Sequence, residues 1–158
     1  MKRRTISTLV TSLGVLGLLS ACGGNGNDVD VNLDGSMDVE TEEGTAKIGT
    51  QDMPNNWPED APGAYPGSTV SYSASMDPES GKPDMAIVST TTDAAATVAA
   101  HYKTALAEKG WAVGTTMEGA GTSIFSATKD TRTMSLLITG TGQGQTTVTM
   151  AIEIEETE

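Results

Sequence analysis

The chain has 158 residues, with nine Lys and Arg against 21 Asp and Glu, which gives a formal net charge of −12. The length fits one ordinary domain, and the acidic balance argues against nucleic acid as a partner because phosphates would be repelled. A single Cys excludes an internal disulfide framework and a thiolate zinc cluster, and a single His leaves little for general-base chemistry. The composition therefore favours a protein that is not an enzyme.

The first 22 residues have the composition of an export signal. Three basic residues at positions 2–4 precede an apolar stretch, 6–19, that is too short and too rich in Ser, Thr and Gly for a membrane-spanning helix. The stretch ends in the sequence Leu-Ser-Ala-Cys, with Cys22 as its last residue, and only Gly and Asn follow at 23–27. This order resembles the lipobox of bacterial lipoproteins.

The resemblance implies that the Cys22 thiol carries a diacylglyceryl group and that the chain is cut just before it. A signal peptide, 1–21, is then followed by a flexible tether, 22–28. The lipid bilayer is a partner through the acylated Cys22, and the protein is placed in the cell envelope. Gly23, rather than Asp, after the Cys favours the outer membrane of a Gram-negative cell. Cleavage leaves six bases against 21 acids, a net charge of −15.

An acidic stretch follows, and it resembles the calcium loop of EF-hands and dockerin-type repeats. The residues at positions one, three, five and nine of this loop are Asp30, Asn32, Asp34 and Asp38. Gly35 makes the turn at position six, but position twelve is Thr41, where such loops carry an acid. Calcium is therefore one expected ligand, and no other cofactor is expected.

Two other interpretations use the same residues. Val29, Val31 and Leu33 alternate with polar residues before an Asp-Gly turn, and a similar turn and alternation recur nine residues later. This pattern predicts a short acidic β-meander over 29–53. Plain acidic disorder is the third interpretation.

Four prolines between positions 54 and 67 predict an extended lead-in, because proline restricts itself and the residue before it. The segment also contains Trp57 and Tyr65, which we expect to hold it onto the domain. An aromatic docking site for a peptide is the functional alternative.

The folded domain is expected over 68–156. Alternation of apolar and polar residues predicts strands at 70–76, 85–92, 111–117, 122–129, 134–138 and 148–154. Short loops join most of them, so neighbouring strands should pair antiparallel. The expected fold is α+β with the order ββαββββ, an antiparallel sheet of about six strands with one helix on one face.

The helix is expected between the second and third of these strands. Thr92 or Asp93 is the predicted cap at its start, and Gly110 follows its end at about Lys109. Its apolar stripe consists of Val98, Tyr102, Ala105 and Leu106.

Residues 54–155 are also similar to a group of uncharacterised bacterial envelope lipoproteins. The residues that carry the likeness are Trp57-Pro58, Asp60-Ala61-Pro62, Tyr65-Pro66-Gly67, Thr92-Asp93, Tyr102 and Lys109-Gly110-Trp111. The likeness supports the fold and the envelope location and implies no activity.

Three functions follow as hypotheses. The first is a non-enzymatic envelope lipoprotein that binds or scaffolds a protein partner through the open sheet face or the acidic segment. The second is a carrier that holds a lipid or another small apolar ligand between helix and sheet. The third is calcium binding through the segment from Asp30 to Asp38. An enzyme is not expected, because His101 is the only imidazole and residues 140–144 predict a hairpin loop rather than a phosphate loop.

Overall fold

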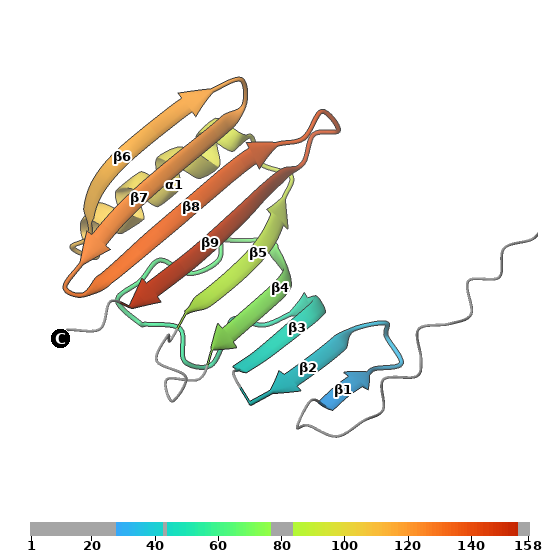
Figure 1. Ribbon diagram of the computed structural model, residues 1–158. Coiled ribbons are helices and arrows are strands. Elements are labelled where there is room, and N and C mark those ends of the chain that lie inside the picture. Colours follow the sequence, from blue (N-terminus) through green and yellow to red (C-terminus); the bar gives the residue numbers. More distant parts are fainter. Residues whose placement is uncertain (1–27, 43, 77–83, 155–158) are drawn as a thin grey trace, which may run out of the picture.

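The computed structural model of the protein describes residues 28–42, 44–76 and 84–154. These residues form one antiparallel sheet of nine strands and one helix (Figure 1). The strand order in the sheet is β1-β2-β3-β4-β5-β9-β8-β7-β6. The predicted signal peptide, the acylation at Cys22 and the predicted tether up to residue 27 lie outside the described residues.

The first five strands are β1 (Asp28–Val31), β2 (Met37–Thr41), β3 (Gly44–Gln51), β4 (Thr69–Met76) and β5 (Met85–Thr91). The helix α1 (Ala95–Glu108) follows β5 and carries the chain from the middle of the sheet to its far edge. Three hairpins then bring the chain back to the middle through β6 (Ala112–Gly119), β7 (Thr122–Lys129), β8 (Arg132–Gly140) and β9 (Thr146–Ile154).

The predicted α+β class with a sheet of about six strands is wrong, because the fold is nearly all β, with nine strands and a single helix of 14 residues. From β4 onward the elements do follow the predicted order ββαββββ. The difference comes from the acidic segment, whose last strand pairs with β4 in a register that sets Lys47 opposite Ser73. Alternation along the sequence predicts strands in this segment, but it does not say which strand they pair with.

The helix covers only part of one face of the sheet, which we call the inner face. It contacts β6, β7 and β8 (Figure 1). The Pro-rich lead-in between β3 and β4 also lies against the core, where Met53, Trp57 and Tyr65 pack against it. Ala61 of this segment is 3 % exposed and belongs to the core itself. The lead-in is therefore a second covering element, formed without helix or strand.

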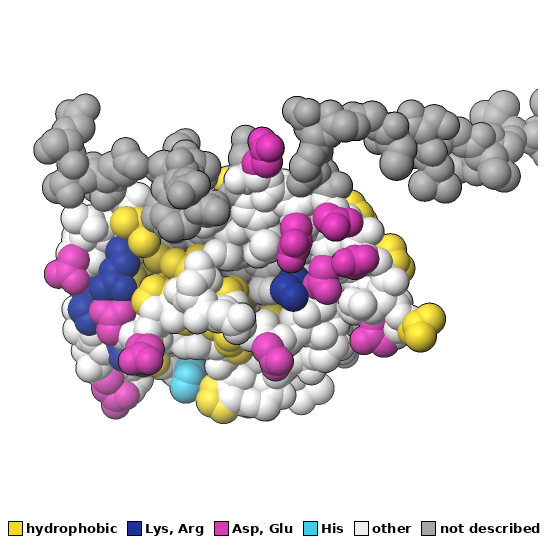
Figure 2. Space-filling model, turned by 90° about the horizontal axis from the view of Figure 1, so that it is seen from below, with side chains coloured by type: hydrophobic (Ala, Val, Ile, Leu, Met, Phe, Trp, Pro, Cys, Tyr) yellow, Lys and Arg dark blue, Asp and Glu magenta, His cyan; other side chains and the backbone are white. Residues whose placement is uncertain are grey.

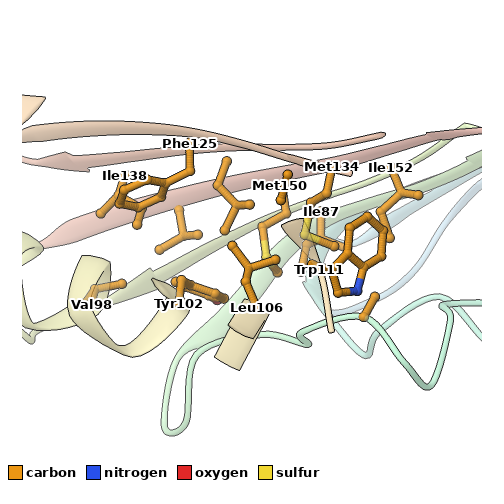
Figure 3. Close-up of a cluster of buried hydrophobic side chains, with 14 of the residues drawn as sticks. Ile87, Val98, Tyr102, Leu106, Trp111, Phe125, Met134, Ile138, Met150 and Ile152 are labelled. Atoms are coloured by element: carbon orange, nitrogen blue, oxygen red, sulfur yellow. The ribbon is translucent and has the colours of Figure 1, made fainter. Parts of the chain in front are cut away.

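The core lies between these covers and the sheet (Figure 3). The helix contributes Val98, Tyr102 and Leu106 of the predicted stripe, whereas Ala105 is half-buried. The large hydrophobic side chains of the strands that are fully buried are Ile87, Phe125, Met134, Leu136, Ile138, Val148, Met150 and Ile152. Aliphatic residues and methionine thus supply most of the core volume, as expected for a chain with few aromatic residues.

The strand register determines which residues share a face of the sheet. One row of the inner face runs through Asp30, Asp38, Lys47, Ser73 and Ile87. It begins in acidic residues and ends in the core, so the acidic side chains lie beside the core on the same face. Figure 2 shows acidic side chains grouped around one basic side chain, with hydrophobic side chains further along the same side of the molecule.

Helix α1 begins without the predicted cap. Its N-cap residue is Ala94, which makes no side-chain capping bond. The Asp93 carboxylate instead accepts a hydrogen bond from the Tyr65 hydroxyl at 2.6 Å, and the Asp93 carbonyl accepts one from Thr146 Oγ1 at 2.7 Å. Tertiary partners therefore occupy the groups that the sequence assigns to the cap. After the last turn, Gly110 has a φ of 76°, the left-handed conformation expected of a glycine at that position.

Candidate binding surfaces

A groove separates the N-terminal half of α1 from the hairpin between β6 and β7, and we call it the helix–hairpin groove. Its volume is about 350 Å³, which lies within the range of small-molecule sites. The helix side is lined by Ala95, Ala96, Ala99 and Ala100, and the hairpin side includes 119–121, which are Gly, Ala and Gly. These small side chains leave a space that larger residues would fill.

One ion pair lies in the lining of the groove. Lys103 Nζ is 2.7 Å from Glu118 Oε1, and the two side chains are 42 % and 50 % exposed. The same ammonium lies over the Phe125 ring, 5.3 Å from its centroid. An ion pair this exposed contributes little to stability. An anionic group that enters the groove can therefore replace Glu118 as the partner of Lys103.

The interior between helix and sheet is filled by side chains (Figure 3). Val98, Tyr102 and Leu106 of the helix are 0 % exposed, and Phe125 and Leu136 of the strands are at most 1 % exposed. The sequence-based hypothesis places an apolar ligand in this interior. The structure offers space for one at the edge of the interface, in the helix–hairpin groove.

A second hollow, of about 390 Å³, opens beside β3, β4 and the start of the lead-in. Its lining is mostly polar and includes Lys47, Asn56 and Ser75. Asn56 Nδ2 donates to Ser75 Oγ at 2.6 Å, and Lys47 Nζ lies 3.4 Å from Asp38 Oδ1. These polar groups already have partners in the protein, so the hollow is less suited than the helix–hairpin groove to an apolar ligand.

The four residues predicted to bind calcium lie on and between β1 and β2. Asp30 and Asp38 are register partners, and Asn32 Nδ2 donates to Asp38 Oδ2 at 3.3 Å. Asp34 lies in the turn, where its Oδ1 accepts bonds from the Ser36 hydroxyl at 2.7 Å and the Ser36 amide at 3.0 Å. These bonds lower the pKa of Asp34. No group of three or more His, Cys, Asp or Glu in the described part of the chain is arranged to hold a metal ion, and calcium binding stays a prediction.

Asp60 fastens the lead-in to the sheet, and no sequence motif singles it out for this role. Its carboxylate accepts two hydrogen bonds of 2.7 Å from the Arg132 guanidinium and lies 2.9 Å from Lys129 Nζ. These two cations hold the pKa of Asp60 well below its usual range. The Asp60 carbonyl accepts a bond of 2.7 Å from Trp111 Nε1. Asp60 lies 51 residues from Trp111 and 72 from Arg132 in the sequence. No local sequence pattern therefore predicts that these residues contact one another.

The two aromatic residues expected to hold the lead-in both do so. Tyr65 donates to Asp93, and this bond raises the pKa of Tyr65. Trp57 packs against the core, and its Nε1 donates at 3.0 Å to a carbonyl within the lead-in. The His101 ring meets the rings of Tyr65 and Tyr102 edge to face, at centroid distances of 5.0 and 5.3 Å. The only histidine of the chain thus belongs to a packed aromatic cluster outside the groove.

The face opposite the helix, which we call the outer face, carries a row of side chains that are hydrophobic at every position except Thr149. In strand order from β1 to β6 the register partners are Val31, Met37, Ile48, Tyr72, Val88, Thr149, Leu137, Ile124 and Met117. Five of them are 42 % to 69 % exposed: Val31, Ile48, Leu137, Ile124 and Met117. The open sheet face through which the sequence-based hypothesis expects a protein partner to bind is therefore this outer face.

Comparison with known proteins places most of the folded part of the chain in a family. The model of the START domain-like family matches residues 70–150, from β4 into β9. This span is 81 of the 158 residues and contains α1, the β6–β7 hairpin and the groove between them. No curated protein and no solved structure matches the chain.

Within the described ranges, no helix is both long enough and apolar enough to cross a bilayer.

Proposed function

Because the chain belongs to the START domain-like family, we propose that it is a binding protein that takes a small apolar ligand in the helix–hairpin groove. The observation that carries the proposal is the groove itself. It is a hollow of about 350 Å³, lined mostly by alanine and glycine, within the matched residues. The groove favours the ligand-carrier hypothesis over the scaffolding hypothesis for this side of the molecule.

The lining of the groove indicates the class of ligand. The methyl groups of Ala96, Ala99 and Ala100 favour an aliphatic chain or ring. Lys103 offers an ammonium group to a carboxylate or phosphate, which would take the place of Glu118. The proposed ligand is therefore amphipathic, with a short apolar part and one anionic group, as in a fatty acid.

The proposal is for binding without a chemical step. Lys103, the basic group in the groove, is paired with Glu118, and His101 is packed between Tyr65 and Tyr102. A general base must reach the proton that it abstracts, and His101 is not among the residues that line the groove. The groove thus offers shape, apolar surface and one charge, which are the requirements of a carrier.

We further propose that acylation of Cys22 holds this domain at the cell envelope, in the outer membrane if the cell is Gram-negative. The support is the order of basic residues, apolar stretch and Leu-Ser-Ala-Cys in the first 22 residues. From Cys22 to the start of β1 the chain spans six residues, which reach about 20 Å when extended. At that distance the domain can exchange an amphipathic ligand with the bilayer.

A tryptophan placed in the groove tests ligand binding. Ala100 is exposed and lines the groove, so Ala100→Trp fills the space with an indole. Ala107 is exposed on the same helix but outside the groove, so Ala107→Trp is a matched control. The full chain is titrated with a fluorescent fatty acid, and native mass spectrometry records any lipid that co-purifies. We expect the wild type and the control to bind alike and Ala100→Trp to bind at least about tenfold more weakly.

Two results would contradict the ligand proposal. One is the absence of fatty-acid binding and of co-purified lipid in the wild type. The other is equal binding by the wild type and both variants, which would place the ligand elsewhere. The mass of the chain extracted from its own envelope tests the anchor separately, because an acylated Cys22 adds the mass of its acyl groups and Cys22→Ser removes that addition.

A further inference from the structure

The outer face of the sheet is an open surface on the side opposite the groove, and we propose that it is the interface between two copies of this chain. A row of register partners crosses it from Val31 on β1 through Ile48, Val88 and Leu137 to Met117 on β6. Eight of the nine residues in the row are hydrophobic, and Thr149 on β9 is the ninth; large exposed apolar patches are rare on monomeric proteins. The row therefore indicates a surface that becomes covered.

The distribution of charge supports a second copy as the occupant. Among the described strand residues, Glu153 is the one charged residue on the outer face. Asp28, Asp30, Asp38 and Glu40, the acidic residues of β1 and β2, all lie in inner-face register positions. Two copies of a strongly acidic chain can thus bring their outer faces together without bringing these carboxylates together.

The hairpin of β1 and β2 is an independent indication that a second copy covers the outer face. All four residues of β1 are exposed, and Val29 and Val31 are 52 % and 69 % exposed. On β2, Val39 is half-buried and faces Val29 in the register. β1 is an edge strand of the sheet, and none of its four residues is buried. A second sheet packed on the outer face would bury these valines and stabilise the hairpin.

The size of the outer face matches what a dimer needs. Nine strands spaced about 4.8 Å apart span about 38 Å, and strands of about seven residues are about 23 Å long. The face therefore offers roughly 870 Å², slightly more than the about 800 Å² that each partner buries in a standard interface. Two sheets that pack face to face keep their strands roughly aligned and lie about 10 Å apart, and the side chains of the two contacting faces interleave. A two-fold axis over the outer face produces this arrangement from identical faces.

A bilayer surface suits the outer face less well than a second copy does. Surfaces that lie on membranes combine apolar residues with lysine or arginine and with tryptophan or phenylalanine. The register positions of the outer face hold none of these four residue types among the described strands, and Tyr72 is the one aromatic residue there. Serine, threonine and alanine make up much of the rest.

A charge placed on the outer face tests the dimer. The full chain carrying Cys22→Ser is examined by sedimentation velocity over a range of concentrations, alone and with Leu137→Arg or Ile48→Arg added. Both side chains are exposed, at 42 % and 46 %, so each arginine is compatible with the fold of a single copy. Ala107→Arg, on the exposed side of α1, is the matched control. We expect a dimer for the parent and the control, and self-association at least about tenfold weaker for both outer-face variants.

Circular dichroism and the melting temperature check that each variant is folded. If one outer-face variant does not fold, the self-association of the other outer-face variant decides the test. A monomeric parent at all concentrations overturns the proposal. So does a dimer that survives both Leu137→Arg and Ile48→Arg, because residues 1–27 or another surface would then form it. Flotation with phosphatidylcholine vesicles that is lost in Leu137→Arg and kept in Ala107→Arg overturns it in favour of a lipid surface.

Discussion

At the residue scale, two buried hydroxyl groups have opposite environments. Ser89 on β5 is 0 % exposed, and its hydroxyl has no hydrogen-bond partner among the described residues. Thr146 on β9 is 2 % exposed, and its Oγ1 donates to the Asp93 carbonyl at 2.7 Å. A buried hydroxyl costs free energy when it is unpaired and contributes to stability when it is paired.

Ser89→Ala and Thr146→Val should therefore shift stability in opposite directions. We expect Ser89→Ala to raise the free energy of unfolding by about 1 kcal/mol, because it removes an unpaired polar group. Thr146→Val keeps the shape of the side chain but leaves the Asp93 carbonyl without its donor, so it should lower that free energy by about 1 kcal/mol. Urea unfolding of both variants measures the difference. A loss of stability in Ser89→Ala would show that its hydroxyl is bonded after all.

Asp60 predicts a dependence of stability on pH. Its pKa lies below the usual value near 3.8 because Arg132 and Lys129 bind the carboxylate. A depressed pKa means that Asp60 stabilises the fold fully above about pH 4 and that this contribution is lost as the pH falls further. We expect Asp60→Asn to lower the free energy of unfolding by roughly 1 kcal/mol at pH 7, since the carboxylate is 41 % exposed and screened by solvent.

Urea unfolding of the wild type and Asp60→Asn at pH 7, 5 and 3 checks this prediction, and the gap between the two should narrow at pH 3. Asp130→Asn is the matched control. Asp130 lies 3.5 Å from the same Arg132 but is 77 % exposed, so its loss should have little effect. A gap that widens as the pH falls would have the wrong sign for a carboxylate with a lowered pKa.

At the scale of elements, the Pro-rich lead-in replaces a second helix as cover for the inner face. Two turns within the lead-in are closed by backbone hydrogen bonds of 3.0 Å, one from Trp57 N to the Pro54 carbonyl and one from Ala61 N to the Pro58 carbonyl. Its attachment depends on contacts with distant elements, among them the bond from Trp111 Nε1 to the Asp60 carbonyl. The segment is thus ordered by tertiary contacts rather than by a regular backbone pattern.

Trp111→Phe separates this attachment from the packing of the core. The phenyl ring keeps most of the buried aromatic surface at this position, where Trp111 is 3 % exposed, but it removes the indole donor. We expect the amide of Ala61 to exchange hydrogen several-fold faster, because the lead-in opens locally more often. Amide hydrogen exchange measured residue by residue checks this. A uniform increase across β8 and β9 would indicate global destabilisation and contradict the attachment role.

Most elements were predictable at this scale, and their boundaries and caps less so. Period-two alternation predicts the strands from β4 onward, and the stripe of Val98, Tyr102 and Leu106 predicts α1. The cap was predicted at the wrong residue because Asp93 is used by Tyr65 and Thr146, which are 28 and 53 residues away in the sequence. The capping preference of Asp93 is therefore overridden by hydrogen bonds to residues far away in the sequence.

At the scale of the whole molecule, the sheet separates two kinds of surface. Its inner face carries the core, the two covers and the acidic residues of the N-terminal hairpin. Its outer face carries the apolar row and Glu153 as the one charged strand residue in the described ranges. The proposed ligand groove and the proposed dimer interface therefore lie on opposite sides. Both can be occupied at the same time, as the two proposals together require.

The fold class shows where prediction from the sequence ended. A short acidic β-meander was predicted over 29–53, but its pairing with β4 was not, and this pairing changed a sheet of about six strands into one of nine. The register between β3 and β4 shifts between Ile48 and Gln51, which no period in the sequence indicates. The groove could not be predicted from the sequence either, because it forms where alanines of α1 face glycines of the β6–β7 hairpin, which comes later in the chain.

The sequence by itself determined the positions of strands and helix, the extended lead-in and the N-terminal resemblance to a lipoprotein, because each depends on residues close together in the chain. Only the tertiary structure decided that β5 pairs with β9, that Asp60 meets Arg132, and that hydrophobic side chains of eight strands align in one row on the outer face. These features join residues up to 72 positions apart. Their contacts are selected by the packing of the whole chain, which no local pattern contains.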